Sequence, residues 1–311
     1  MQITVLGSYG EGNLGDEAIL EGIRLRFPEA SFTVFTHNLS LSLAQHPGMH
    51  AQIMLPAGIR SYLKQISTGQ LKKSINILKE SDLILIGGGG IFYDSKFSNG
   101  RNPVKVWYWR TKLLKKLGLK FELYCVGISK LKKEKSRKLM NKISELAERV
   151  SVCDKGSERN LREIGFADKI ELKTDPAFDF IKEKGEVYSE YTVGISLRKW
   201  QEQNKFFEKA LSKLTELSQG KNIEIKLIPM STGIDDDRIV LREFKARLPE
   251  ELRKKTELLE LKTPASAYSA IAGLDYLIGM RLHSLIFAKL SGIKYFPLVY
   301  DEKIEGTLGT T

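Results

Sequence analysis

The fold of this chain is decided at its start, where residues 2–20 read QITVLGSYGEGNLGDEAIL. The apolar beginning predicts a strand over Gln2–Ser8, and the amphipathic pattern that follows predicts a helix over Glu17–Phe27. The glycines between them permit tight turns, and Asp16 stands where a helix N-cap belongs. A strand, a glycine-rich turn and a helix in this order form the first part of a βαβ unit.

The same alternation of apolar runs and amphipathic stretches continues through the first half of the chain. Further strands are predicted at Ser31–Thr36, Asp82–Gly87, Phe121–Ile128, Val150–Asp154 and Ile170–Thr174. Further helices are predicted at Gln70–Glu80, Lys133–Glu148 and Ser157–Ile164. Strands that are apolar on both faces are typical of a parallel sheet covered by helices on each side.

The pattern is interrupted near residues 178–190 and then restarts. Strands are predicted at Tyr191–Leu197, Glu224–Pro229, Leu258–Leu261, Tyr276–Gly279 and Tyr295–Tyr300, with helices at Asn204–Ser218, Asp236–Ala246, Pro264–Leu274 and Ser284–Leu290. A chain of 311 residues is long enough for two domains. We therefore expect an α/β protein with two Rossmann-like domains, 1–180 and 190–311, and an active cleft between them.

The net charge of +11 indicates anionic partners, such as phosphorylated substrates, acidic polymers or a membrane surface. Lysines are spread along predicted helices, and no homeodomain, zinc-finger or RNA-recognition signature is present. We therefore expect no nucleic-acid partner. Peripheral association with the inner face of the membrane is compatible with this charge, and a basic, solvated face is the simpler alternative.

The cysteines and the apolar runs predict a cytoplasmic protein. Cys125 and Cys153 lie in apolar, strand-like segments without a CxxC or a Cys/His cluster, which predicts two buried free thiols in a reducing compartment. The N-terminus has no signal-peptide pattern, and the longest apolar run, Leu83–Phe92, is too short to span a bilayer.

The strongest candidate for a functional site is the turn Gly279-Met280-Arg281-Leu282-His283, which lies between a predicted strand and a predicted helix. A helix N-terminus attracts anions, a guanidinium binds carboxylate or phosphate, and an imidazole moves protons near neutral pH. Together these features favour an enzyme that binds an anion and transfers a proton. The plainer alternative is that Arg281 forms a surface ion pair and His283 caps the helix.

Other unusual residues also follow predicted strands, where ligands bind in open parallel sheets. The Gly7–Ala18 turn lacks the GxGxxG spacing and a Walker lysine, and Gly87–Asp94 is expected to be a glycine-rich loop. Arg198 follows a strand of the second half, and three aspartates, Asp235 to Asp237, follow another. We interpret these aspartates as helix caps rather than as Mg²⁺ ligands, because neighbouring residues on a helix point in different directions.

Taken together, these residues resemble the polysaccharide pyruvyl transferase family. The segments that carry the resemblance are Gly12–Leu20, Gly87–Asp94, Asp154–Leu161, Asp175–Phe178, Gly194–Arg198, Arg281–His283 and Tyr300–Lys303. They occur in the expected order along nearly the whole chain. This chain departs from the family pattern in two ways. It has Cys153 where an Arg often precedes the family's Asp-x-x-Ser element, and it ends at Thr311, whereas family members usually continue through further C-terminal helices.

The resemblance implies a glycosyltransferase-B-like fold and transfer of an enolpyruvyl-derived unit from phosphoenolpyruvate to two hydroxyls of a sugar, giving a cyclic ketal. The acceptor would be a sugar of a cell-envelope polysaccharide or a lipid-linked oligosaccharide precursor. The donor side would lie in the second domain and the acceptor side in the first. No step requires a metal, and phosphoenolpyruvate is a substrate rather than a cofactor.

The resemblance also implies roles for individual residues. It makes Arg198 and Arg281 the donor-binding arginines and His283 the general acid. The other residues expected to bind substrate are Leu282, Asn13, Gly15, Asp16, Gly88, Gly89 and Gly90. Two other functions stay open, a nucleotide-sugar glycosyltransferase of the same fold and a non-catalytic binder of anionic glycans.

Overall fold

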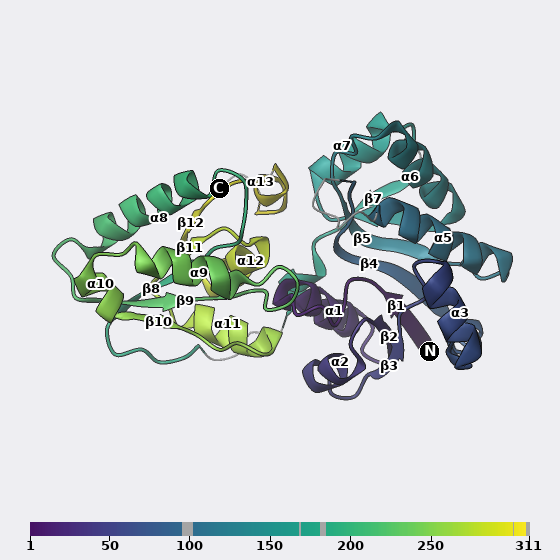
Figure 1. Cartoon of the computed structure of the whole chain (residues 1–311), viewed down its shortest axis with the longest axis horizontal. Coiled ribbons are helices and arrows are strands. Elements are labelled where there is room, and N and C mark those ends of the chain that lie inside the picture. The colour runs from purple at the N-terminus through teal and green to yellow at the C-terminus, as the bar shows by residue number, and fades with distance from the viewer. Residues whose placement is uncertain (95–101, 168, 181–184, 301, 309–311) are drawn as a thin grey trace. The chain divides into compact units, whose positions relative to one another are not determined.

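The computed structural model describes residues 1–94, 102–167, 169–180, 185–300 and 302–308. It divides the chain into two compact domains, each visible in Figure 1. The first domain comprises Met1–Glu11 with Ile19–Pro176, and the second comprises Gly12–Ala18 with Ala177–Thr311. A short N-terminal segment is therefore part of the second domain, which the sequence pattern did not indicate.

The first domain is built on a seven-stranded sheet in the order β3-β2-β1-β4-β5-β6-β7, with parallel pairing throughout. Its strands are β1 (Gln2–Leu6), β2 (Ser31–Thr36), β3 (His50–Ile53), β4 (Leu83–Phe92), β5 (Glu122–Ile128), β6 (Arg149–Val152) and β7 (Ile170–Leu172). Its helices are α1 (Leu14–Arg26), which starts in the second domain, α2 (Leu39–Gln45), α3 (Ile59–Ser67), α4 (Gln70–Lys79), α5 (Pro103–Lys116), α6 (Glu134–Leu146) and α7 (Lys155–Glu163).

The second domain repeats this plan with a five-stranded parallel sheet in the order β10-β9-β8-β11-β12. Its strands are β8 (Tyr191–Ser196), β9 (Ile223–Leu227), β10 (Thr256–Leu258), β11 (Tyr276–Gly279) and β12 (Lys294–Pro297). Its helices are α8 (Gln203–Ser218), α9 (Asp237–Ala246), α10 (Glu250–Lys254), α11 (Pro264–Ala272), α12 (Leu282–Ser291) and α13 (Glu302–Leu308).

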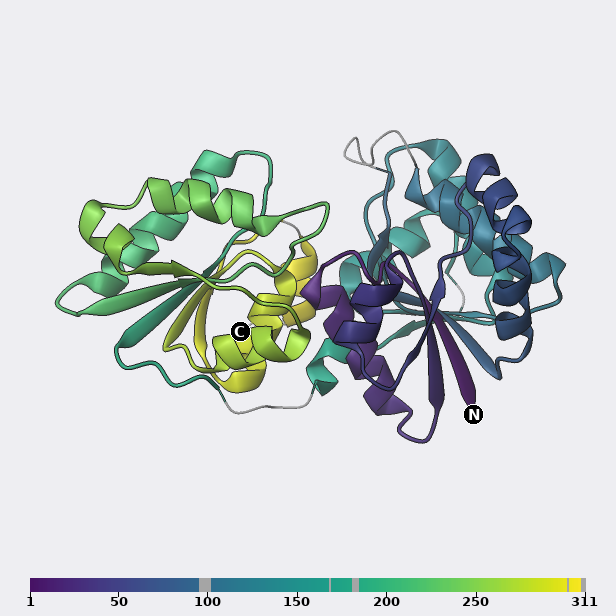
Figure 2. The ribbon, with the colours of Figure 1, turned by 60° about the horizontal axis from the view of Figure 1, so that its bottom comes forward.

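Both sheets have the doubly wound order in which the chain starts at a central strand, runs to one edge, and then crosses back to the other half. Helices cover both faces of each sheet (Figure 2). The central strands are consequently buried along their length, as Val5, Leu85, Val193 and Ile278 illustrate with exposures of 0%. The prediction of an α/β protein with two parallel sheets is confirmed.

The glycines Gly87–Gly90 lie inside β4, so the prediction of a loop that starts at Gly87 is wrong. These glycines continue the pairing with β5, with a register irregularity between Gly89 and Phe92. A Cβ atom on Gly87 would overlap the carbonyl oxygen of Tyr124, and one on Gly88 would overlap the hydroxyl of Tyr9. Gly87 and Gly88 are therefore explained by close packing of neighbouring chain segments, whereas a Cβ atom on Gly90 would meet nothing within 4 Å.

The two cysteines form a disulfide, so the prediction of free thiols is wrong. Cys125 lies in β5, and Cys153 directly follows the neighbouring strand β6. The pairing of these strands is irregular between Leu123 and Val126, and Cys125 in this interval has a φ of 52°. Their Cα atoms are 4.9 Å apart, within the range that a disulfide bridges. The inference of a reducing compartment from free thiols thus loses its basis.

Several elements were not predicted, among them β3, α2, α3 and α5. His46 and His50 flank the short connection into β3, and His46 is only 1% exposed. Its Nδ1 lies 2.6 Å from Oε1 of Glu21. In the described part of the chain, no helix has the length and apolar character needed to cross a membrane.

Candidate functional site

The site forms where β8 and β11 lie side by side in the middle of the second sheet. Ser196 at the end of β8 pairs with Gly279 at the end of β11, and Arg198 and Arg281 each follow two residues later. The chain leaves β8 toward β9 on one side and leaves β11 toward β12 on the other. This divergence is the switch point at which doubly wound sheets bind ligands.

Arg281 is held in place by a buried carboxylate. The residue is 8% exposed, and its Nε atom donates to both carboxylate oxygens of Asp237, at 3.1 and 3.0 Å. Its Nη2 atom donates to Oδ1 of the same residue at 2.5 Å. Asp237 also accepts backbone N–H groups of Met230 and Ser231, at 3.1 and 3.0 Å. The guanidinium therefore has a fixed orientation before any ligand binds.

The charges of this pair are strongly coupled. Burial raises the pKa of Asp237 to about 6, and the guanidinium of Arg281 acts in the opposite direction. Burial also disfavours the charge of Arg281, but the carboxylates of Asp237 and Asp235 outweigh it and raise the pKa of the guanidinium. At neutral pH both groups are charged, and Arg281 stays a cation in a nearly water-free position.

Asp235 bridges the two arginines. Its Oδ2 atom accepts from Nη2 of Arg198 at 2.6 Å and from Nη2 of Arg281 at 3.0 Å. The Asp235 side chain is 43% exposed, whereas that of Arg281 is 9% exposed. A partly exposed carboxylate thus lies between two oriented guanidinium groups, which is the arrangement of a bound carboxylate ligand.

Aromatic rings complete the surroundings of Arg198. Its Nη1 atom donates to the Tyr300 hydroxyl at 3.1 Å, and its guanidinium lies 5.3 Å from the centre of the Trp200 ring and 5.5 Å from that of Tyr300. Its Nε atom and the Oγ atom of Ser196 are buried polar atoms without a hydrogen-bond partner in the part of the chain that the structure describes. These two groups retain hydrogen-bonding capacity at the switch point.

His283 lies next to Arg281 in the chain, as the second residue of α12, whose N-cap is Arg281. The segment Gly12–Ala18 is attached beside it: Leu14 donates its N–H to the Met230 carbonyl at 2.8 Å. A Cβ atom on Gly15 would overlap the His283 imidazole at Nδ1. The glycine therefore lets the backbone of this segment lie directly against the imidazole ring.

Asn13 orders this N-terminal segment. Its Oδ1 atom accepts from the N–H of Gly15 at 3.1 Å, and its Nδ2 atom donates to Oδ2 of Asp16 at 2.8 Å. Because α1 begins at Leu14, Asp16 lies in the first turn of the helix, and the prediction that it is the N-cap is wrong. Asn13, directly before the helix, supplies the side-chain oxygen that Asp16 was expected to supply.

The structure thus brings together most of the predicted site residues in the second domain. Arg198 and Arg281 share Asp235, Gly15 packs against His283, and Leu282 is the first residue of α12 with 8% exposure. Gly88, Gly89 and Gly90 belong to β4 of the first domain. Of the plainer alternatives for the turn, the helix cap at His283 is wrong, and Arg281 does form ion pairs, but in a buried position rather than at the surface.

Sequence reasoning missed the roles of Asp235 and Asp237. Asp236 is the N-cap of α9, as predicted, and accepts from the N–H of Arg238 at 2.9 Å. Its two neighbours turn toward the arginines, and the sequence signal for this was only a second and a third acidic residue beside a cap. Among the described residues, no group of three or more His, Cys, Asp or Glu side chains is placed to hold a metal ion.

The first domain has a smaller polar cluster near the C-terminal ends of β1 and β2. His37 and Glu11 lie 3.6 Å apart, and Arg110 donates to the Leu55 carbonyl from Nε and Nη2. Partial burial and the nearby charge of Arg110 lower the pKa of His37 to about 4. His37 is therefore neutral at neutral pH, so its contact with Glu11 is not an ion pair.

Comparisons with known proteins identify the family to which this chain belongs. The family model described as polysaccharide pyruvyl transferase matches residues 13–302. This chain belongs to the polysaccharide pyruvyl transferase family. The match begins at Asn13 and includes both site arginines and His283. A comparison of this family member with curated proteins finds no match.

Solved structures show that the pyruvyl transferase fold is shared with sugar-modifying enzymes. The UDP-GlcNAc 2-epimerase of Methanocaldococcus jannaschii, solved in complex with UDP-GlcNAc and UDP, is 14% identical with a TM-score of 0.58, over 99% of this chain and 86% of that one. The UDP-N-acetylglucosamine 2-epimerase of Rickettsia bellii is 10% identical with a TM-score of 0.59, over 98% and 81%. At these identities the likeness shows the fold alone, and it confirms the predicted glycosyltransferase-B-like fold.

Proposed function

We propose that this protein transfers the enolpyruvyl-derived group of phosphoenolpyruvate to two hydroxyls of a sugar, forming a cyclic ketal. The acceptor in this proposal is a cell-envelope polysaccharide or its lipid-linked precursor. The observation that carries the proposal is the Asp235 carboxylate held between Arg198 and Arg281, beside the helix that bears His283. The site already accommodates a carboxylate, and phosphoenolpyruvate carries both a carboxylate and a phosphate.

The donor would bind by replacing Asp235. The carboxylates of Asp235 and Asp237 balance the charges of the two arginines, so an added anion needs one of them to leave. Asp237 is buried and fixed by four donors, counting two N–H groups and two guanidinium nitrogens, whereas Asp235 is on a partly exposed loop. Asp235 is therefore the exchangeable carboxylate, and Asp237 keeps Arg281 in place.

The reaction then needs one proton on the methylene carbon. In our proposal His283 donates this proton, and the resulting oxocarbenium-like carbon is attacked by the first sugar hydroxyl, whose proton returns to a base. The carbon–oxygen bond to phosphate breaks, the second hydroxyl closes the ring, and its proton leaves with inorganic phosphate. General acid catalysis of this kind contributes roughly 10²–10⁴-fold to a rate.

The test is calorimetric titration of phosphoenolpyruvate, which does not require knowledge of the acceptor. Arg281→Ala should abolish saturable binding, because it removes the guanidinium that faces the ligand and leaves Asp237 as a buried, unpaired carboxylate. The matched control is Arg238→Ala on the neighbouring turn, since Arg238 pairs with Asp236 alone among the contacts described here. Binding that survives Arg281→Ala in a folded protein would contradict the proposed donor site.

The role of His283 is tested with the same protein. His283→Ala should leave phosphoenolpyruvate binding within about threefold and lower turnover at least about 100-fold, because the proton donor is lost and the arginines remain. Turnover near the wild-type rate would show that another group supplies the proton.

A nucleotide-sugar enzyme is the second candidate, since the epimerase of similar fold was solved with UDP-GlcNAc and UDP. Saturable binding of a nucleotide diphosphate sugar, without binding of phosphoenolpyruvate, would favour it. A non-catalytic binder of anionic glycans would instead show salt-dependent polymer binding that is unchanged in His283→Ala.

A further inference from the structure

Helix α3 of the first domain carries an apolar stripe that is exposed to solvent. Ile59, Tyr62, Leu63 and Ile66 are spaced i, i+3, i+4 and i+7, so they lie on one side of the helix. Their exposures are 80%, 43%, 60% and 50%, and α3 has no buried residue. Exposed apolar residues that gather on one side of a helix are typical of a surface that contacts a protein partner or a membrane.

The polar side of the same helix is the one that contacts the protein. Gln65 donates from Nε2 to the Met54 carbonyl at 3.0 Å, and the Oγ atom of Ser61 accepts the N–H groups of Ala57 and Gly58, at 3.1 Å each. A surface helix normally turns its apolar side inward. In α3 the orientation is reversed, because the polar residues attach it and the apolar residues face solvent.

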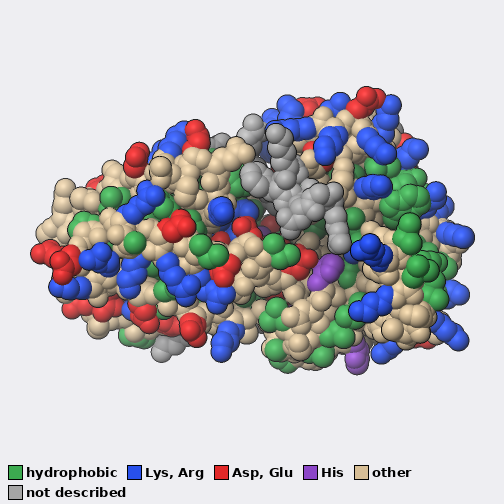
Figure 3. Space-filling model, viewed as in Figure 1, with side chains coloured by type: hydrophobic (Ala, Val, Ile, Leu, Met, Phe, Trp, Pro, Cys, Tyr) green, Lys and Arg blue, Asp and Glu red, His purple; other side chains and the backbone are tan. Residues whose placement is uncertain are grey.

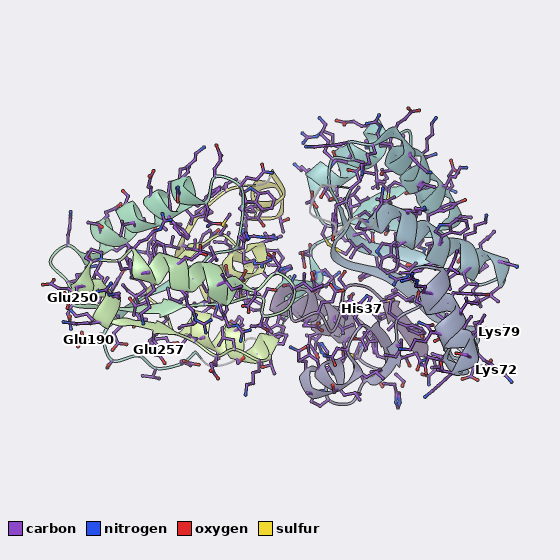
Figure 4. The ribbon with its side chains drawn as sticks, viewed as in Figure 1. His37, Lys72, Lys79, Glu190, Glu250 and Glu257 are labelled. Atoms are coloured by element: carbon purple, nitrogen blue, oxygen red, sulfur yellow. A yellow bond between two sulfur atoms is a disulfide. The ribbon has the colours of Figure 1, made fainter. Side chains whose placement is uncertain are left out.

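Helices α3, α4 and α5 carry basic residues and no carboxylates. The sequence contains no Asp or Glu from Ala30 to Lys79, nor within α5. The exposed basic residues of α3, α4 and α5 are Arg60, Lys64, Lys72, Lys73, Lys79, Lys105, Lys112, Lys115 and Lys116. At the right-hand edge of Figure 3, hydrophobic side chains gather over this region with Lys and Arg around them, and Figure 4 shows Lys72 and Lys79 at the same edge.

Helix α5 also carries an exposed aromatic residue. Trp109 is 53% exposed, and Nζ of Lys112 lies 5.1 Å from the centre of its ring. The next residue, Arg110, donates to the Leu55 carbonyl, just before α3 in the chain. Exposed Trp and Tyr beside Lys and Arg are the residues found at membrane interfaces.

We infer that the α3 stripe and the basic residues of α3, α4 and α5 form a docking surface for a bilayer that contains anionic phospholipids. Apolar side chains would enter the boundary between headgroups and acyl chains, and the basic residues would lie among the phosphates. A second copy of the chain fits less well, because pairing this surface with itself would bring like charges together. The surface includes no residue of the candidate active site, so this inference does not depend on the proposed reaction.

The experiment is flotation of the full chain with vesicles of phosphatidylcholine alone and of phosphatidylcholine with phosphatidylglycerol. The informative variant is Leu63→Glu, and its matched control is Leu43→Glu. Both are exposed leucines on short helices of the same acid-free stretch, at 60% and 49%, but Leu43 is outside the stripe. Both variants change the net charge equally, so a difference between them reports insertion of the stripe.

The wild-type chain should float with the anionic vesicles and much less with the neutral ones. Leu63→Glu should weaken this binding at least about tenfold, and Leu43→Glu should stay within about twofold of wild type. Ile66→Glu repeats the test should Leu63→Glu fail to fold, which far-ultraviolet circular dichroism would reveal. Absent vesicle binding, equal losses in both variants, or a dimer in sedimentation that Leu63→Glu dissociates in place of vesicle binding would each overturn the inference.

Discussion

At the residue scale, single side chains determine the arrangement of charges at the candidate site of the second domain. Asp235 and Asp237 are two positions apart in the chain, yet one is 43% exposed at the side chain and the other is completely buried. The buried carboxylate fixes Arg281, and the exposed one fills the space between Arg198 and Arg281. Two aspartates beside the same arginine thus differ in environment, and only Asp235 is accessible to solvent.

The exchange of Asp235 for a ligand carboxylate can be measured. Asp235→Asn removes the competing negative charge and keeps the size of the side chain, so phosphoenolpyruvate should bind about five- to tenfold more tightly. The control is Asp236→Asn, since Asp236 pairs with Arg238 and caps α9. Calorimetric titration gives both values, and weaker binding by Asp235→Asn than by wild type would count against displacement.

His37 makes the first domain sensitive to mild acid. Its pKa is lowered to about 4 in the folded chain, below the value of about 6.5 for a histidine in an unfolded chain. Between these values the unfolded chain binds more protons, so stability falls as the pH falls from about 6.5 to about 4. The side chain is 43% exposed, so solvent screens the effect and we give only its direction.

The measurement is the melting temperature of wild type and His37→Gln at pH 7 and at pH 5. The wild-type protein should lose more than the variant over this interval, because the variant lacks the titrating group. A proton magnetic resonance titration of His37 should show no change of charge above pH 5. A midpoint near 6.5 would mean that the ring is as accessible to protons as it is in an unfolded chain.

At the scale of elements, strand β4 shows how packing shapes the first sheet. Its glycines admit Tyr124 of β5 and Tyr9, whose hydroxyl donates to the Gly87 carbonyl at 2.7 Å. On the other side of β5, the disulfide to Cys153 joins the strand to the start of α7, where Asp154 is the N-cap. These contacts connect the middle of β4, the middle of β5 and the end of β6.

The disulfide should contribute measurably to the stability of the first domain. The two cysteines are 28 residues apart, and closing a loop of this length is worth about 3 kcal/mol. Cys153→Ser should therefore lower the free energy of unfolding by roughly this amount in the absence of reductant. Urea unfolding followed by circular dichroism measures it, and reductant should remove most of the difference between the two proteins. An equal stability without reductant would show that the bond does not constrain the unfolded chain.

At the scale of the whole molecule, the chain uses one plan twice. In each sheet the chain starts at a central strand, β1 or β8, and the connections run in opposite directions from this strand and from its neighbour, β4 or β11. The polar residues of the second domain gather at the second of these switch points, and the segment Gly12–Ala18 belongs to that domain although it follows β1 in the chain. Through this segment, the first helix of the chain contributes its N-terminal turn to the site beside His283.

The sequence by itself determined the fold class, the family and the positions of the polar residues at strand ends. Strand and helix periodicities are local, so alternating βα units, two parallel sheets and the turn at Arg281 can be inferred from neighbouring residues. The site roles of Arg198, Arg281 and His283 came from family resemblance, and they stay predictions.

Only the tertiary structure decided which distant groups meet. The pairing of Ser196 with Gly279, the carboxylates beside each arginine, the disulfide and the contact of Gly15 with His283 all join segments far apart in the chain. Such contacts depend on strand order, register and the course of the backbone, which local periodicity does not encode. The outward apolar side of α3 belongs with them, because its amphipathic pattern alone would have placed that side in the core.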